Sequence, residues 1–309
     1  MTKVLIAYDG SPCSNAAIDD IKHAALPDQI EARVISVADV WLPSETEPAE
    51  SSYTTPPAVA KMRAQARLVL ENARELAAAG CQRLQQLHPG WKLTPMAVAD
   101  SPAWAIIRQA DTWPADLVLV GSHGRSILER LFLGSVAERV VAEAKCSVRI
   151  CRPRQSSGTP RLMVAVDGSA GSEAAVREVA ARCWPAGTTA RVIAVIDPRL
   201  QSAIAWPGVY ADRWMTGDTQ QADEWVCGMT AHFSESLRAA GIQAESHIFN
   251  GDPKHVVLKQ AEDWNTDTIF IGARGLQHGD RLYLGTFASS VAARAHCSVE
   301  VVRPSTPAA

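Results

Sequence analysis

Short runs of apolar residues recur along the chain, and glycine, aspartate or proline closes most of them. A continuous apolar run bounded by turn-forming residues is typical of a strand buried in a parallel sheet. Ten runs fit that description and are predicted to be strands, five in each half of the chain. They cover 4–8, 32–38, 92–99, 117–120 and 147–152, then 162–166, 191–196, 244–249, 268–271 and 299–302.

Segments with the composition of helices separate these strands. The second half repeats the order of the first, in which helices are predicted at about 12–25, 58–87, 102–110 and 135–145. Strands that alternate with helices form parallel sheets whose two faces are both covered. We therefore predict an α/β fold of two tandem doubly wound domains, each with a five-stranded parallel sheet. The domains are expected at 1–152 and 161–305, joined by a linker of Pro, Ser and Gly at 153–160.

A glycine pattern occurs once in each half, directly after an apolar strand. Gly121-Ser122-His123-Gly124 is followed by nine residues and Gly134-Ser135. The pattern returns 151 residues later as Gly272-Ala273-Arg274-Gly275, nine residues and Gly285-Thr286. Each copy ends where a helix begins, so Ser135 and Thr286 are predicted at the N-cap. A glycine turn that leads into a helix N-terminus presents backbone N–H groups to an anion, so the pattern predicts two phosphate sites.

Ligands of an open parallel sheet bind beyond the carboxyl ends of its strands, where the winding reverses. Asp9 and Asp167 end the first strand of each half and should face the glycine turns across that crevice. An aspartate there suits a ribose hydroxyl, or a Mg²⁺ ion that bridges phosphates. The backbone near Val37 and Val195, at the end of each second strand, is expected to contact a purine edge.

Simpler interpretations of these residues stay open. The glycines could only form turns, and Asp9 and Asp167 could only cap the helices that follow. His123 has Arg274 as its repeat partner, which favours a loop histidine over a catalytic base. Other residues in loops have two interpretations each. Arg130 and Arg281 could pair with the preceding acid or reach phosphate, and Trp206, Tyr210 and Trp214 could form a lid or an interface patch.

Composition and motifs exclude several function classes. Neither first strand is followed by Gly-x-Gly-x-x-Gly, and the P-loop pattern Gly-x-x-x-x-Gly-Lys-Ser/Thr does not occur. A net charge of −3 gives no basic excess for nucleic acid. No apolar run approaches the roughly 18 residues of a membrane helix. Seven cysteines without a Cys-x-x-Cys pair are typical of reduced thiols in the cytoplasm, and no zinc spacing occurs. No repeat-matched residues form a catalytic set, so no catalytic residue is predicted.

Together with the glycine patterns, three further features carry a resemblance. They are the first strands that end in Asp-Gly-Ser, the Gly251-Asp252-Pro253 turn, and the endings Cys146-Ser147-Val148 and Cys297-Ser298-Val299. The chain resembles two fused copies of the ATP-binding universal stress proteins over nearly its whole length. The resemblance implies a Rossmann-like fold of the adenine nucleotide alpha hydrolase-like type. It also implies that the final strands of the two units pair, so that the tandem chain imitates the family's dimer, with a homodimer of the chain as a further option.

The resemblance also assigns the site. The adenine of ATP would contact backbone near Val37 or Val195, and Asp9 or Asp167 would serve the ribose and the metal. The phosphates would lie on the motif residues of one half or the other: Gly121, Gly124, Gly134 and Ser135, or Gly272, Gly275, Gly285 and Thr286. Two departures are visible. Ala99-Asp100-Ser101-Pro102 stands where the second half has Gly-Asp-Pro, and Arg125 aligns with Leu276.

We therefore expect a cytoplasmic stress-response protein that binds ATP with Mg²⁺ and acts as a nucleotide-responsive module, not as a fast enzyme. Two alternatives stay open. One is a slow Mg-dependent ATPase or phosphotransferase, because bound Mg²⁺ and oriented N–H groups stabilise phosphoryl charge. The other is an interaction scaffold that binds no nucleotide.

Overall fold

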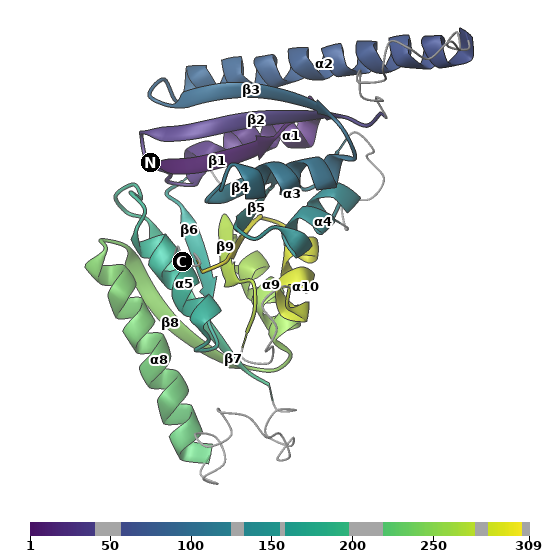
Figure 1. Cartoon of the computed structure of the whole chain (residues 1–309). Coiled ribbons are helices and arrows are strands. Elements are labelled where there is room, and N and C mark those ends of the chain that lie inside the picture. Colours follow the sequence, from purple (N-terminus) through teal and green to yellow (C-terminus); the bar gives the residue numbers. More distant parts are fainter. Residues whose placement is uncertain (41–56, 125–132, 155–157, 198–218, 276–283, 305–309) are drawn as a thin grey trace.

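The computed structural model describes residues 1–40, 57–124, 133–154, 158–197, 219–275 and 284–304 (Figure 1). The first half contains β1 (Thr2–Ala7), α1 (Pro12–Asp20), the 3-10 turn η1 (Ile21–His23), β2 (Ile30–Ala38), α2 (Pro57–Leu87), β3 (Lys92–Ala99), α3 (Pro102–Thr112), β4 (Leu117–Gly121), α4 (Ser135–Glu143) and β5 (Ser147–Cys151). The second half contains β6 (Arg161–Ala165), α5 (Ala170–Ala180), β7 (Thr189–Ile196), α8 (Thr219–Ala239), β8 (Gln243–Asn250), α9 (Pro253–Asp263), β9 (Thr268–Gly272), α10 (Thr286–Arg294) and β10 (Ser298–Val302).

The ten described strands form one sheet in the order β3-β2-β1-β4-β5-β10-β9-β6-β7-β8. Neighbouring strands within each half run parallel. β5 and β10 are the antiparallel neighbours at the centre, with Val299 opposite Ile150 and Val301 opposite Val148. In each half the first strand lies between the second and the fourth strand of that half. The winding therefore reverses between β1 and β4 in the first half and between β6 and β9 in the second. The predicted α/β fold with two doubly wound five-stranded units is therefore confirmed.

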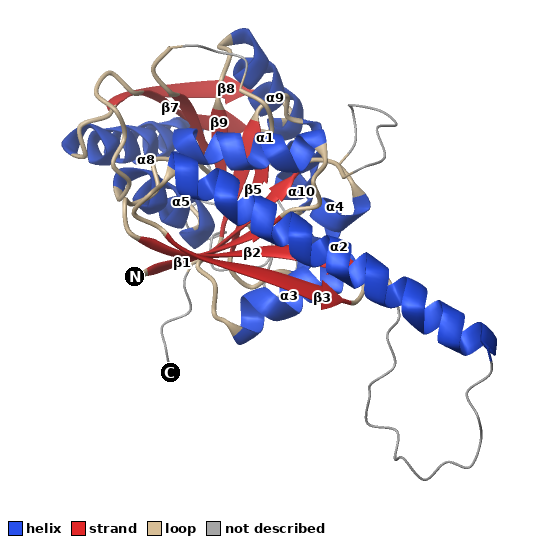
Figure 2. Ribbon diagram, turned by 90° about the horizontal axis from the view of Figure 1, so that it is seen from above, coloured by secondary structure: helices blue, strands red, loops and turns tan. Residues whose placement is uncertain are grey.

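Helices cover both faces of the sheet (Figure 2). On one face, α3, α4, α9 and α10 pack over a single apolar cluster that contains Leu5 and Val140 from the first half and Ile269 and Val291 from the second. On the other face, α1 and α2 cover one cluster, and α5 and α8 cover another. Successive side chains of a strand point to opposite faces, so the strand that sends Leu5 to the shared cluster sends Ile6 to the separate one.

Two arginines connect each half to the helix end of the other half. Arg152 follows β5 and donates to the carbonyl oxygen of Ala292, in α10, at 2.7 Å. Arg303, 151 residues later, follows β10 and donates to the carbonyl oxygen of Val141, in α4, at 2.6 Å. A cation at the end of a helix satisfies the last carbonyls and complements the helix dipole. The two contacts hold the ends of α4 and α10 against the central strand pair.

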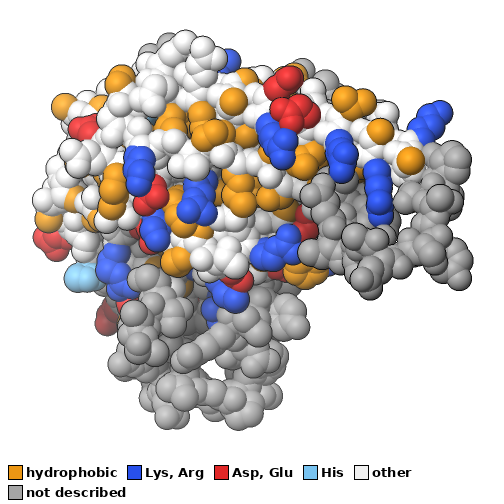
Figure 3. Space-filling view, turned by 45° about the horizontal axis from the view of Figure 1, so that its top comes forward, with side chains coloured by type: hydrophobic (Ala, Val, Ile, Leu, Met, Phe, Trp, Pro, Cys, Tyr) orange, Lys and Arg blue, Asp and Glu red, His pale blue; other side chains and the backbone are white. Residues whose placement is uncertain are grey.

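A helix that spans a membrane has to be both long and predominantly apolar. None of the described helices combines the length and the low polarity that crossing a bilayer requires. Figure 3 shows basic, acidic and apolar side chains mixed over one face of the molecule.

Burial should make the cysteines differ in reactivity. Cys183 and Cys227 are exposed, whereas burial raises the pKa of the Cys146 thiol to about 11 and that of Cys297 to about 12. The thiolate is the reactive form. We expect iodoacetamide at pH 8 to modify Cys183 and Cys227 first, as measured by peptide mass spectrometry. Cys146 and Cys297 should react only after unfolding in guanidinium, and their early modification in the folded protein would contradict the packing described here.

Candidate functional site

The predicted site residues lie at the carboxyl ends of central strands. β1 and β4 are parallel neighbours, so Asp9 and Gly121 reach the same edge of the sheet. β6 and β9 bring Asp167 and Gly272 to the same edge of the second half. In both halves this edge is also the place where the winding reverses, which is where open α/β sheets bind ligands.

Each aspartate lies against the second glycine of its motif. Asp9 Oδ1 accepts a hydrogen bond from the Ser11 amide at 3.0 Å, and a Cβ on Gly124 would lie 3.2 Å from Asp9 Oδ2. Asp167 repeats both contacts. Its Oδ1 accepts from the Ser169 amide at 3.0 Å, and a Cβ on Gly275 would lie even closer to Asp167 Oδ2 than the corresponding Cβ on Gly124 would lie to Asp9 Oδ2. One carboxylate oxygen is thus held by backbone while the other lies beside the glycine turn.

The interpretation of Asp9 and Asp167 as helix caps is wrong, because serines cap these helices. The Ser11 hydroxyl accepts from the Ser14 amide at 3.1 Å, and the Ser169 hydroxyl makes the equivalent bond at 3.2 Å. The aspartates lie two residues before the caps. Their carboxylates order the turn that leads to the helix, through the amides of Ser11 and Ser169.

Gly121 and Gly272 have a packing role that the sequence analysis missed. A Cβ on Gly121 would lie 2.9 Å from the backbone of Cys13, in the first turn of α1. A Cβ on Gly272 would lie 2.8 Å from the Cα atom of Gly171, in α5. The space that a side chain would need is filled by the protein's own helix. Glycine here lets a helix begin directly against a strand end, and does not open that side to an oxyanion.

The last glycines of the motifs, and not Ser135 and Thr286, are the N-caps of α4 and α10. The amides of Gly134 and Gly285 donate to carbonyl oxygens twelve residues earlier, at 2.8 and 2.9 Å, so the two ends of each motif lie together. Ser135 and Thr286 are the first helical residues, and both are exposed. The first N–H groups of a helix have no acceptor within it. The backbone amides that follow each N-cap glycine are therefore the groups that could donate hydrogen bonds to an anion.

Neither N-cap glycine supplies a side-chain oxygen to these amides. In the same fold, α1, α5 and α9 each have an N-cap side chain that accepts from a backbone amide, whereas α3, with Ser101 at its N-cap, has no such side-chain bond. The N-cap residues of the two helices that follow the glycine motifs thus leave the first N–H groups uncapped among the described residues, and a helix start of this kind suits an anion.

Val37 and Val195 lie near the carboxyl ends of β2 and β7. Val37 is opposite Val98 on β3, and Val195 is opposite Phe249 on β8. Both valine side chains are half-buried and pack against the shared apolar cluster. A ligand at this edge would consequently meet their backbone more readily than their side chains.

His123 lies within the first motif, with Nδ1 3.2 Å from the Ser122 hydroxyl. Its Nε2 atom is buried and has no hydrogen-bond partner among the described residues. The partner of Nδ1 is a hydroxyl and not the carboxylate that orients a catalytic histidine in the Ser-His-Asp triad, which favours the interpretation as a loop histidine. The other loop residues considered from sequence lie outside the described residues: Arg125, Arg130, Trp206, Tyr210, Trp214, Leu276 and Arg281.

A cavity of about 850 Å³ lies at the opposite, amino-terminal edge of the second half, with three arginines in its wall. Arg161 and Arg238 donate to backbone carbonyls, and the Arg191 guanidinium stacks 4.5 Å from the centre of the Trp264 ring. The first half repeats the same stack at 4.4 Å. These arginines pack against the amino-terminal edge of the sheet, and the cavity lies away from both glycine motifs.

The described residues contain no group of three or more His, Cys, Asp or Glu side chains placed to hold a metal ion. The chemistry available at Asp9 and Asp167 is one carboxylate each. A cation there would need further oxygens from a bound ligand.

Comparisons with known proteins agree with this architecture. The family model described as Universal stress protein family matches residues 1–152 and 159–303. A universal stress protein of Methanocaldococcus jannaschii is 30% identical over 152 residues, which cover 48% of this chain and 81% of that protein. Universal stress protein YxiE of Bacillus subtilis is 29% identical over 154 residues, covering 48% of this chain and 98% of the relative.

A solved structure resembles the whole chain. The crystal structure of a universal stress protein from Archaeoglobus fulgidus has a TM-score of 0.61 and 20% sequence identity. The match covers 97% of this chain and 98% of the solved one. At that identity the likeness concerns the fold.

The packing role of Gly121 and Gly272 can be tested by adding one methyl group. Gly121→Ala and Gly272→Ala should each lower the free energy of unfolding by about 1–3 kcal/mol, because the backbone of the adjoining helix must move. Gly228→Ala is the matched control, since a Cβ there meets nothing within 4 Å, in the interior of α8. It should raise stability by up to about 1 kcal/mol. Urea unfolding measures all three, and Gly121→Ala with wild-type stability would refute the role.

Proposed function

Because the chain belongs to the universal stress protein family, as two tandem units, we propose that it is a nucleotide-responsive stress-response module that binds ATP with Mg²⁺ in each half. We further propose that residues 1–152 and 161–305 are the two domains and that the protein acts in the cytoplasm. The family assignment rests on the model match over both halves. The ligand assignment rests on the resemblance described above and on the chemistry of the site.

The observation that carries the proposal is an arrangement present in both halves. A carboxylate lies beside a glycine turn, and the turn leads to a helix start without a side-chain cap. Backbone N–H groups and the dipole end of α4 or α10 favour the phosphates of a nucleotide. The proposed hydrogen-bond donors to phosphate are therefore the backbone amides of the first turns of α4 and α10, together with the hydroxyls of Ser135 and Thr286.

Mg²⁺ fits the aspartates on chemical grounds. Mg²⁺ is usually bound by one or two carboxylates together with substrate phosphates and water. Asp9 Oδ2 and Asp167 Oδ2 lie beside the glycine turns, at the side where phosphates are proposed. The ion would neutralise phosphate charge there, and it would depend on the nucleotide for the rest of its ligands. The adenine would lie against the backbone near Val37 or Val195.

We also propose that the pairing of β5 with β10 takes the place of pairing between two chains. Both of these strands are interior to the sheet, so a homodimer would have to use another surface. A slow ATPase stays an alternative that the binding experiments below also address, since nucleotide hydrolysis can be followed in the same samples.

Proline at the first helical position provides a sharp test of the phosphate donors. Proline suits that position and removes one N–H group, and Gly134 before it already has the extended backbone that proline requires, with φ −64° and ψ 148°. Ser135→Pro should therefore leave the unfolding midpoint unchanged and reduce the number of Mg-ATP molecules bound from two to one. Thr286→Pro should do the same in the other half, as measured by titration calorimetry.

Ser135→Ala serves as the control, because it removes the hydroxyl and keeps the amide. It should weaken binding less than Ser135→Pro. If both proline variants still bind two Mg-ATP molecules, the site assignment is wrong. If the wild-type chain binds no ATP, the scaffold alternative is favoured.

The metal role of the aspartates predicts a change in the Mg²⁺ dependence of binding. Asp9→Asn keeps an oxygen that can accept from the Ser11 amide and removes the charge. We expect Asp9→Asn and Asp167→Asn to lower the affinity for ATP in the presence of Mg²⁺ by on the order of tenfold. Affinity measured in EDTA should change little. An equal loss with and without Mg²⁺ would instead assign the carboxylates to the ribose.

A further inference from the structure

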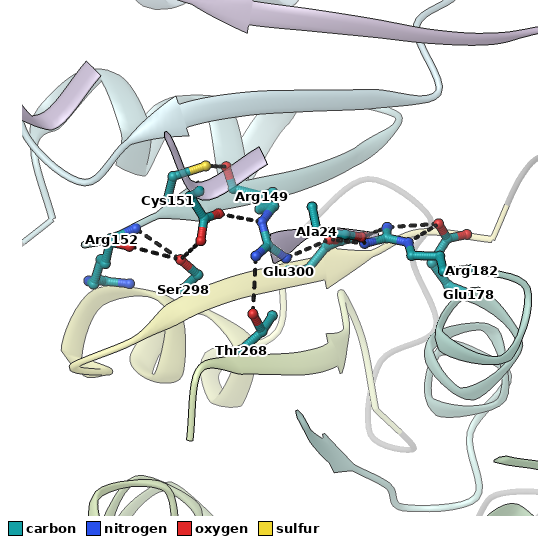
Figure 4. Close-up of polar contacts among 10 residues, drawn as sticks. Ala24, Arg149, Cys151, Arg152, Glu178, Arg182, Thr268, Ser298 and Glu300 are labelled. Atoms are coloured by element: carbon teal, nitrogen blue, oxygen red, sulfur yellow. Dashed lines mark hydrogen bonds and ion pairs between the residues drawn. The ribbon is translucent and has the colours of Figure 1, made fainter. Parts of the chain in front are cut away.

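The centre of the sheet contains buried charges that the proposed nucleotide sites do not use. Arg149 on β5 and Glu300 on β10 are directly opposite each other in the antiparallel pair. Neither residue has exposed surface. Arg149 Nη1 donates to Glu300 Oε2 at 3.2 Å, and Figure 4 shows the two side chains in contact.

Each member of this pair is also bound by its own half. Asp20, at the end of α1, accepts from Arg149 Nε at 2.6 Å. Arg182, just after α5, donates to both carboxylate oxygens of Glu300 and, at 2.8 Å, to Glu178. The result is a row of alternating charges across the boundary between the halves: Asp20, Arg149, Glu300, Arg182 and Glu178. We refer to it as the charge row.

Uncharged partners satisfy the remaining donors of the charge row. Arg149 Nη2 donates to the Thr268 hydroxyl at 3.0 Å, and Arg182 Nη1 donates to the carbonyl oxygen of Ala24 at 3.0 Å. Burial by itself lowers the pKa of the Arg149 guanidinium, but the adjacent carboxylates outweigh burial and hold that pKa above its ordinary value. Arg149 is accordingly charged in the folded protein.

The internal repeat makes the identity of this pair informative. Arg149 and Glu300 are 151 residues apart, which is the shift that relates the two glycine motifs. Arg152 and Arg303 are equivalent by the same shift. Their amides donate to equivalent serine hydroxyls of the opposite half, at 3.0 and 3.1 Å. At these flanking positions the two halves have the same residue, whereas at 149 and 300 they have opposite charges.

Pairing of identical halves would therefore be penalised. Two first halves that met in this register would place Arg149 against Arg149, and two second halves would place Glu300 against Glu300. Each charge would keep the partner from its own half, Asp20 or Arg182. It would nevertheless lose the opposite charge across the strand pair and face a like charge at a position from which water is excluded. Shape and the flanking hydrogen bonds alone would allow a first half to pair with a second half, with another first half, or a second half with another second half. The reason is that the flanking residues are the same in both halves.

We infer that the charge row selects the partner of each half: the first half accepts the second half along β5 and β10, and excludes a second copy of itself. Buried ion pairs add little stability compared with apolar residues of similar size, so stability alone does not account for the row. In coiled coils, a polar residue at one buried position fixes register and oligomer state, and charged residues beside the interface set partner choice. This inference does not depend on nucleotide binding.

The test uses full-length chains with two different affinity tags. Arg149→Glu and Glu300→Arg each place like charges across β5 and β10, both within one chain and between two copies. When the two variants are expressed together, the unmodified first half of one chain and the unmodified second half of the other supply the native Arg149–Glu300 contact. We expect a complex that carries both tags, enriched on the order of tenfold or more over a pair of wild-type chains.

The matched control places the same changes of charge on an exposed helix face. Arg139 and Glu143 form an exposed ion pair on α4 at 3.1 Å. Arg139→Glu and Glu143→Arg, expressed together, should give no complex with both tags. If the two central variants are insoluble when expressed singly, recovery of soluble protein on co-expression supports the inference. Co-expression that yields neither soluble protein nor a complex beyond the control overturns it.

Discussion

The antiparallel pairing of β5 with β10 is the constraint on which the rest of the structure depends. It places both strands in the interior of one ten-stranded sheet, so neither central edge is left exposed. It also lets one apolar cluster continue beneath α3, α4, α9 and α10 from one half to the other. Arg152 and Arg303 then reach across the pair to the helix ends of the opposite half. Each half thus completes part of the other's packing.

The candidate sites depend on a second contact, between a strand end and a helix start. Gly121 and Gly272 allow the first turns of α1 and α5 to lie directly against β4 and β9. That approach brings the turn with Asp9 or Asp167 beside the glycine motif, where a carboxylate and a helix N-terminus meet. A glycine here consequently acts on the site through packing, because it determines where the aspartate lies.

Sequence predicted what depends on local pattern. The apolar runs located the strands to within about two residues, and the repeat located both glycine motifs. It did not distinguish Gly134 from Ser135 as the N-cap, because either residue is common there. The charge row had no local signal at all. Arg149 lies between two apolar residues of a short strand, Val148 and Ile150, and its partner Asp20 is 129 residues away in the chain. Such contacts are visible only once the topology brings distant segments together.

Fusion of two similar units into one chain changes which residues can face each other across the central strand pair. When two identical chains pair, a position that faces its own equivalent must face the same residue, so opposite charges cannot meet there. A tandem chain removes that restriction, because Arg149 and Glu300 can change independently. The same freedom extends to the sites, where a Cβ on Gly275 would lie closer to Asp167 than a Cβ on Gly124 would lie to Asp9. Each half can therefore change at the central strand pair and at its glycine motif independently of the other half.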